Sequence, residues 1–190
     1  MSRAWAASVL AMLLAGCQPP PEATPLRRPA TVADLAARLP AEAAGFQRGA
    51  TTPLPRGEDG REIGYRTPGR IAAGATVQLY RLPGVVLPEG LSSPDAADAF
   101  NDLLQDAMRP APQRRLREEA RFTLPAEGPA LLRCAETAGS YGRERVQGLL
   151  CAGSLGGGLL RLRVTMPRQE PLPADSRAFA TGILAALRTP

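Results

Sequence analysis

Two cysteines, Cys134 and Cys151, stand at equal distances from the middle of one short connection. The segments around them, 130–137 (ALLRCAET) and 147–154 (QGLLCAGS), read as strands, and the residues between them are turn formers. If the chain reverses near Gly142, the cysteines face each other in an antiparallel hairpin. The spacing therefore predicts a hairpin that a Cys134–Cys151 disulfide can close.

Two alternatives to a structural disulfide are a redox-active pair and two free thiols. Redox pairs usually occur as C-x-x-C at a helix N-terminus, and this chain has no such motif. A bond that closes a loop of this size stabilises a fold by roughly 3 kcal/mol. The hairpin pattern favours the structural bond.

A third strand, 159–166 (LLRLRVTM), alternates cleanly between apolar and polar residues. Leu160, Leu162, Val164 and Met166 are expected to face the core, and Arg161, Arg163 and Thr165 to face solvent or a partner. The glycine-rich stretch before it, GSLGGG, lacks the lysine of a phosphate loop and precedes a strand, so it predicts a turn. Ser154 is not in a G-x-S-x-G elbow, because Ala152 replaces the first glycine.

Further patterns predict three helices and two more strands. Helices are expected at 31–39, where Thr31 and Asp34 form a capping box, at 94–108, which Ser93 caps, and at 174–188. Strands are expected at 61–66 and 75–81. The fold class is thus α+β, an antiparallel sheet of about five strands with helices packed on it, in the order α-β-β-α-β-β-β-α.

This order, and the final step from LLRLRVTMP to ADSRAFATGILAAL, is similar to PsbP-like and DcrB-like domains. The resemblance spans much of residues 31–188 and rests on no diagnostic motif. It implies an accessory or binding module and carries no catalytic residues to this chain.

Residues 5–16 are mostly apolar or small and too short to span a bilayer as a helix, which needs roughly 20 residues. They have the length and flanks of a secretory signal peptide. Leu14-Ala15-Gly16-Cys17 resembles the lipobox of bacterial lipoproteins. That resemblance implies cleavage after residue 16 and acylation of Cys17, which would become the membrane anchor. The alternative is an ordinary signal peptide with an incidental cysteine.

The resemblance also implies a location. Residue 18 is glutamine rather than the aspartate that favours inner-membrane retention, so the periplasmic face of the outer membrane is favoured over the inner membrane. An exported chain meets an oxidising compartment, which supports the Cys134–Cys151 bond. The expected organisation is a signal peptide (1–16), a lipidated Cys17 with a proline-rich tether (17–30), and one α+β domain (31–190).

All 23 basic residues are arginine, and the chain contains neither lysine nor histidine. This composition is typical of a GC-rich genome, so the net charge of +5 does not indicate nucleic-acid binding. The absence of histidine removes the commonest general base and metal ligand, and the absence of lysine removes Schiff-base chemistry. We expect no nucleic-acid partner, no cofactor and no metal.

Arginines concentrate in 109–121 (RPAPQRRLREEAR) and on the outward face of 159–166. They define a candidate contact surface for an envelope protein or an anionic envelope polymer: Arg114, Arg115, Arg117, Arg161 and Arg163. The alternative for 109–121 is a solvated connection. The aspartates of 94–108 (Asp95, Asp98, Asp102 and Asp106) lie along one helix and indicate a solvated face rather than a calcium site.

The functional prediction is a membrane-anchored envelope lipoprotein that acts as a non-enzymatic binding or structural accessory module. The alternative is a cell-envelope hydrolase using Ser, Thr or carboxylate chemistry. Its adjacent acidic pairs, Glu58-Asp59 and Glu118-Glu119, do not suit a glycosidase dyad, because neighbours on a strand point to opposite faces. We therefore expect no catalytic residues.

Overall fold

The computed structural model describes residues 30–189, so the predicted signal peptide, Cys17 and the predicted tether up to residue 29 lie outside the described residues. Within that range the chain forms three helices and eight strands. In chain order they are α1 (Val32–Arg38), β1 (Glu42–Ala43), β2 (Phe46–Pro53), β3 (Glu58–Arg66), β4 (Gly74–Arg81), α2 (Pro94–Met108), β5 (Arg114–Leu124), β6 (Leu132–Tyr141), β7 (Glu144–Leu155), β8 (Gly158–Pro167) and α3 (Ser176–Arg188).

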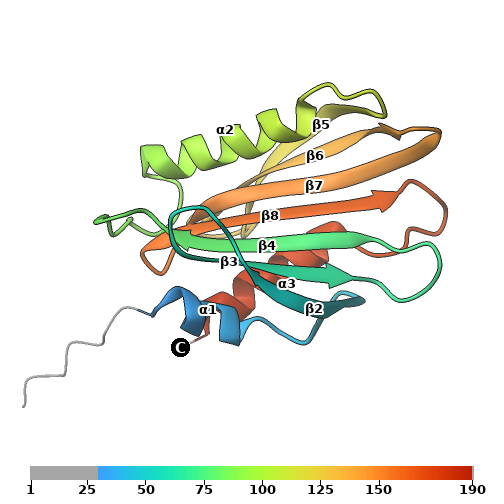
Figure 1. Cartoon of the computed structure of the whole chain (residues 1–190). Helices are drawn as coiled ribbons and strands as arrows, with labels where there is room; N and C mark the ends of the chain where they lie inside the picture. The colour runs from blue at the N-terminus through green and yellow to red at the C-terminus, as the bar shows by residue number, and fades with distance from the viewer. Residues whose placement is uncertain (1–29, 190) are drawn as a thin grey trace, which may run out of the picture.

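These strands form one antiparallel sheet in the order β1-β2-β3-β4-β8-β7-β6-β5. Strands β1 to β4 make one meander, β5 to β8 make a second, and α2 connects the two. The meanders join where β4 pairs with β8, with Val77 opposite Leu162. The sheet curls into a half-barrel with α2 on one side and α3 on the other (Figure 1).

The predicted sheet of about five strands in the order α-β-β-α-β-β-β-α is wrong. The sequence patterns missed β1, β2 and β5. Of the residues of β2 only Phe46 is buried, and of those of β5 only Leu124. Both strands lie at or beside a sheet edge, where polar side chains are tolerated on both faces, so neither shows the apolar alternation that marks a strand.

The predicted helices are confirmed, with small shifts at their ends. Thr31 and Asp34 form the capping box of α1, in which the Asp34 N–H donates to Thr31 Oγ1 at 3.1 Å and the Thr31 N–H donates to Asp34 Oδ2 at 2.8 Å. Ser93 caps α2 as predicted. Asp175 caps α3, which therefore begins at Ser176 rather than at residue 174.

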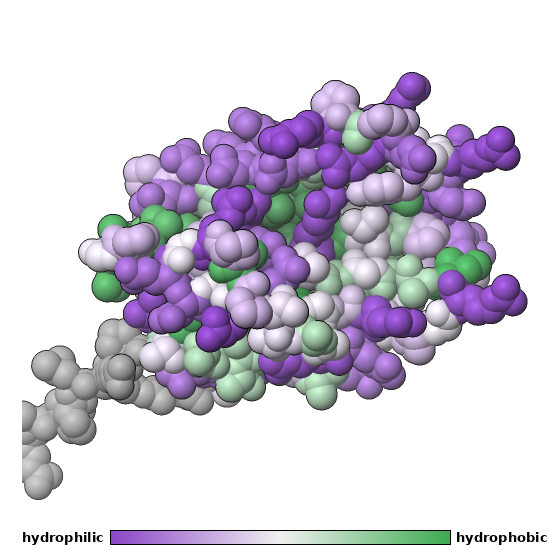
Figure 2. Space-filling view, in the orientation of Figure 1, coloured by the Kyte–Doolittle hydropathy of each residue, from purple (hydrophilic) through white to green (hydrophobic). Residues whose placement is uncertain are grey.

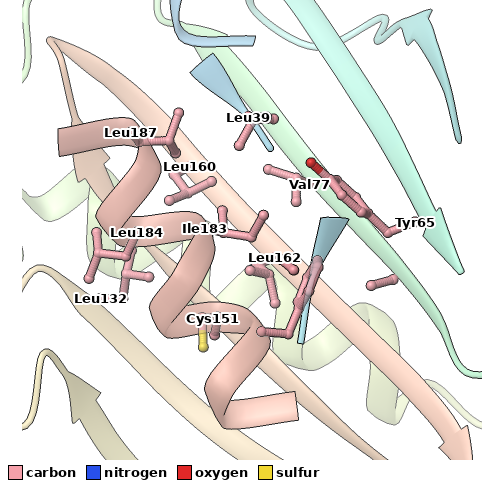
Figure 3. Packing of buried hydrophobic residues seen from close by; sticks show 14 of the residues in the cluster. Leu39, Tyr65, Val77, Leu132, Cys151, Leu160, Leu162, Ile183, Leu184 and Leu187 are labelled. Atoms are coloured by element: carbon pink, nitrogen blue, oxygen red, sulfur yellow. The ribbon is translucent and has the colours of Figure 1, made fainter. Parts of the chain in front are cut away.

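The main core lies between the sheet and the pair α1 and α3. Ile183, Leu184 and Leu187 of α3 lie over β4, β8, β7 and β6, whose inward residues include Val77, Leu162, Cys151 and Leu132 (Figure 3). The Phe179 ring contacts Phe46 of β2 at 4.6 Å between centroids, and Arg177 lies 4.1 Å over Phe122 of β5. Because strands from both ends of the sheet reach α3, the sheet must curl around that helix.

The other face of the sheet is covered only in part. Helix α2 packs mainly on β7, and Phe100 enters between Arg121 and Arg133, whose guanidiniums lie 5.7 and 5.9 Å from the ring centroid. The residues buried on this side are Tyr80, Leu87, Ala96, Ala99, Phe100, Ala135, Ala152 and Leu159. The outer faces of β3, β4 and part of β8 lie beyond the helix.

The predicted hairpin is confirmed as β6 and β7, which turn at Gly142 and Arg143. Cys134 is the direct register partner of Cys151, and the two form a disulfide bond. The bond lies in the main core and joins two central strands of the second meander.

We expect the double variant Cys134→Ala/Cys151→Ala to lose roughly 3 kcal/mol of unfolding free energy, because a 17-residue separation no longer restricts the unfolded chain. Urea denaturation of the native and variant proteins measures the loss. A reductant should destabilise the native protein by a similar amount and leave the variant unchanged. A native protein insensitive to reductant would contradict the expected role of the bond.

Tyr65 provides a pH-dependent test of the core. Its hydroxyl donates to the Pro40 carbonyl oxygen at 2.8 Å. Burial raises the pKa of the Tyr65 phenol above its usual 10.0, although the nearby Arg48 charge acts in the opposite direction. The folded state therefore keeps the phenol proton where the unfolded chain releases it, so stability falls only as pH rises above about 10.

We expect Tyr65→Phe to be less stable than the native protein by about 1 kcal/mol at neutral pH, because the hydrogen bond is lost. This difference should shrink as the pH rises through about 10 to 11. Denaturant unfolding across that range measures it. A difference that stays constant with pH would show that Tyr65 does not couple folding to its proton.

Candidate functional site

A polar groove runs between α2 and the uncovered part of the sheet. It has a volume of about 430 Å³ and is lined by Leu54, Pro55, Arg56, Glu62, Thr76, Gln78, Leu103, Asp106, Arg161, Leu162 and Arg163. Strands β3, β4 and β8 form its floor, α2 forms one wall, and the β2–β3 connection forms the other. The space-filling view shows a recess in this face, with hydrophobic atoms deep inside and hydrophilic side chains around it (Figure 2).

The alternation of β8 places Arg161 and Arg163 in this groove. Leu160, Leu162 and Val164 are fully or almost fully buried in the main core, as predicted, so the residues between them point to the opposite face. Across the ladder Arg161 is opposite Gln78, and Arg163 is opposite Thr76. The groove floor is therefore built from direct cross-strand neighbours.

Arg161 is expected from the sequence to face solvent or a partner, and in the free domain it is not exposed to solvent. It is only 3% exposed, because α2 crosses over this part of β8. Its ion pair with Asp106 is long, at 3.9 Å between Nη2 and Oδ2. Within residues 30–189, no acceptor lies within hydrogen-bond distance of its buried Nε; the same holds for Arg81 and Arg114, but these two donate hydrogen bonds through Nη2 and Arg161 donates none. A buried charged group with an unsatisfied donor is costly, which makes Arg161 the most unusual side chain in the groove.

The acidic groups of the groove, in contrast, have hydrogen-bond donors. Glu62 Oε2 accepts from Gln78 Nε2 at 2.6 Å, and Asp106 Oδ1 accepts from Arg109 Nη2 at 3.2 Å. Arg56, on the opposite wall, is 3.8 Å from Asp102 of α2. The spare hydrogen-bonding capacity of the groove is thus on Arg161.

A second hollow, of about 380 Å³, continues from the groove and is lined by Arg114, Tyr141, Arg163, Thr76 and Thr165 among others. Arg163 Nη2 donates to Tyr141 Oη at 3.5 Å. Arg114 Nη2 donates to the carbonyl oxygens of Asp106 and Arg109, at 3.0 and 3.1 Å. Arg114 therefore caps the C-terminal end of α2, where a cation is favoured.

Arg115 and Arg117 alternate with Arg114 on β5 and so point to the other face of the sheet. Both are exposed, and Arg117 pairs with Glu119 at 2.6 Å. The structure thus brings Arg114, Arg161 and Arg163 together and separates them from the other two predicted contact residues. Segment 109–121 is neither a loop nor one patch, because most of it is the edge strand β5.

The acidic pairs weighed for catalysis are elsewhere in the structure. Glu118 forms an ion pair with Arg121, whose hydrogen bond lowers the pKa of the Glu118 carboxyl, and Glu119 pairs with Arg117. Ser154 is buried, and its hydroxyl donates to the carbonyl oxygens of Pro88 and Gly90. These contacts anchor the connection between β4 and α2.

No group of three or more His, Cys, Asp or Glu side chains that could hold a metal ion occurs among residues 30–189. In the same range no helix is both long and apolar enough to cross a membrane.

The sequence patterns did not predict the groove, although they did identify the polar positions of the strands that form its floor. Glu62, Thr76 and Gln78 are the polar positions of predicted strands, and Arg161 and Arg163 are those of a third. The order of strands in the sheet was needed to place them side by side, and local periodicity does not contain that order.

No family model, curated protein or solved structure matches the chain. The resemblance of residues 14–17 to a lipobox and that of the domain to PsbP-like and DcrB-like proteins therefore remain predictions.

Replacing Arg161 with methionine should leave the free energy of unfolding unchanged or raise it by about 1 kcal/mol, because a buried, poorly paired charge is removed and half-exposed Asp106 keeps its Arg109 partner. Arg114→Met is the matched control. It should lose about 1 to 2 kcal/mol, because the carbonyl oxygens at the end of α2 lose their donor. Urea denaturation compares the two. A loss above about 2 kcal/mol for Arg161→Met would show that Arg161 is a structural residue.

Proposed function

We propose that the chain is a membrane-anchored lipoprotein of the bacterial cell envelope, on the periplasmic face of the outer membrane, whose domain is a non-enzymatic binding module. The observation that carries the proposal of binding is the groove beside α2, in which a buried guanidinium has hydrogen-bonding capacity that the protein does not use.

The proposed anchor rests on the sequence LAGC at residues 14–17 and on the proline-rich segment that follows. The disulfide is consistent with export, because such bonds persist in oxidising compartments. The predicted tether joins the domain at a defined point. The Ala30 carbonyl oxygen accepts a hydrogen bond from Arg81 Nη2 at 2.5 Å, and Arg81 also donates to Gly156 in the β7–β8 turn.

The chemistry of the groove supports recognition rather than turnover. A guanidinium has five N–H donors and no acceptor, so it binds anions but does not accept a proton from a substrate. The two carboxylates in the groove, Glu62 and Asp106, each accept a hydrogen bond from a neighbouring side chain and so already have a donor within the fold.

A hydrolase remains the alternative function. The observation in its favour is that Glu62 and Asp106 line the same groove. It would require one of the two to act as general acid, whereas the side-chain oxygens of both already accept hydrogen bonds from Gln78 and Arg109. We therefore favour the binding module.

The anchor predicts a specific change in mass and location. The native protein should be found in the membrane fraction, with an intact mass that lacks residues 1–16 and includes acyl chains. Cys17→Ala should lack the added lipid mass and form no lipid anchor, because it has no thiol to acylate. The Cys134→Ala/Cys151→Ala variant is the control and should still be acylated. A mature chain without residues 1–16 and without added lipid mass would refute the anchor.

A further inference from the structure

We infer that the groove beside α2 binds a small organic monocarboxylate, whose carboxylate is held by Arg161. This deepens the proposed binding function and rests on it for the placement of binding in the groove. It does not depend on lipidation of the chain.

The first support is the burial of Arg161. Lysine and arginine side chains are almost never fully buried unless they are paired. Arg161 is 3% exposed, Asp106 is 3.9 Å away, and no residue of the described chain accepts a hydrogen bond from Nε. A carboxylate in the groove would supply the missing acceptors, and arginine binds carboxylates through two parallel hydrogen bonds.

The second support is the distribution of partners among the charged groups. Asp106 has Arg109, and Glu62 has Gln78. Arg163, which reaches the groove from the same face of β8, has a weak 3.5 Å contact with Tyr141. The hydrogen-bond donors without a good partner in the groove are thus on the guanidiniums of Arg161 and Arg163, which indicates an anionic ligand. The carboxylates of Glu62 and Asp106, which line the same groove, disfavour a multiply charged anion, because like charges repel at short range.

The third support is the apolar surface of the walls. Leu54 and Pro55 line one wall, and Leu103 of α2 lines the other. An inorganic anion on Arg161 would leave this surface in contact with water, whereas a ligand with an apolar body of a few carbons would cover it. The volume of about 430 Å³ falls within the range of roughly 300 to 1,000 Å³ that is common for small-molecule sites.

The fourth support is the position of the polar groups that flank the guanidinium. Gln78 is directly opposite Arg161, and Thr76 is directly opposite Arg163 on the same face. Two residues along a strand span about 6.6 Å. The Thr76 hydroxyl and the Arg163 guanidinium therefore lie beside the Arg161 site and can select a ligand by its polar substituents.

The test uses the purified full chain in detergent and five probes: the carboxylates benzoate, acetate and butyrate, the neutral analogue benzamide, and inorganic phosphate. Benzoate should raise the unfolding temperature and shift the NMR resonance of the Arg161 Nε–H group. Benzamide has the same shape without the charge, and phosphate has charge without an apolar body, so both should bind at least about tenfold more weakly.

Three variants locate the binding. Arg161→Met should weaken benzoate binding by about tenfold or more, while a normal urea transition shows that the variant is folded. Arg161→Lys should also weaken it, because an ammonium cannot form the two parallel bonds. Arg115→Met, on the opposite face of the sheet, is the control and should bind as the native protein does.

Three results would overturn the inference. Equal binding of benzoate and benzamide would show that charge is not recognised, and tighter binding of phosphate would make this an inorganic anion site. Failure of acetate, butyrate and benzoate alike to produce an Arg161-dependent shift would show that the groove takes no simple carboxylate. If the chain binds benzoate but carries no lipid, the anchor proposal fails and this inference stands. If the chain is lipidated and binds none of the probes, this inference fails and the anchor proposal stands.

Discussion

Strand β4 pairs with β8 from Gly74 opposite Thr165 to Tyr80 opposite Leu159. This contact joins two meanders that would otherwise be separate sheets with one more exposed edge each. It also fixes which side chains share a face. Val77 and Leu162 point to α3, and Gln78 and Arg161 point to the groove. Since side chains alternate along every strand, a slip of one residue would bury Gln78 in the core and expose Leu162. The core and the groove therefore depend on the same register.

The groove exists because one helix cannot cover one face of this sheet. Eight strands spaced by about 4.8 Å span roughly 34 Å, whereas a helix with its side chains is about 10 to 12 Å wide. The contacts of Phe100 with Arg121 and Arg133 hold α2 over the β5–β8 half. The polar face of β3 and β4 is left beside the helix, so its residues meet solvent or a ligand. On the other face, α1 and α3 together complete the core.

Elements with local signals could be predicted from the sequence. A few neighbouring residues are enough to predict the capping box of α1, the cap of α2, the alternation of β8 and the β6–β7 hairpin with its cysteines. Strand β5 could not be predicted, because an edge strand with charges on both faces shows no apolar period. Its arginines and glutamates pair with one another, and such charges also protect an edge from pairing with other chains. The burial of Arg161 could not be predicted, because its cover, α2, comes from a distant part of the sequence.

The position of Arg161 links stability to the proposed function. A leucine or methionine there would remove a charge from beneath α2 and would not change the alternation of β8, whose core residues are its neighbours. Among the described residues, the fold uses the Arg161 guanidinium only in its long ion pair with Asp106, whereas Arg114 holds the end of α2 through two carbonyl oxygens although its Nε also lacks a partner. Side chains that cost stability in the free protein are expected where a bound partner offsets the cost. The sequence alone placed these two arginines in one contact surface. The structure separates them: Arg114 stabilises the end of α2, whereas Arg161 is held by the fold in the groove, where a ligand can use it.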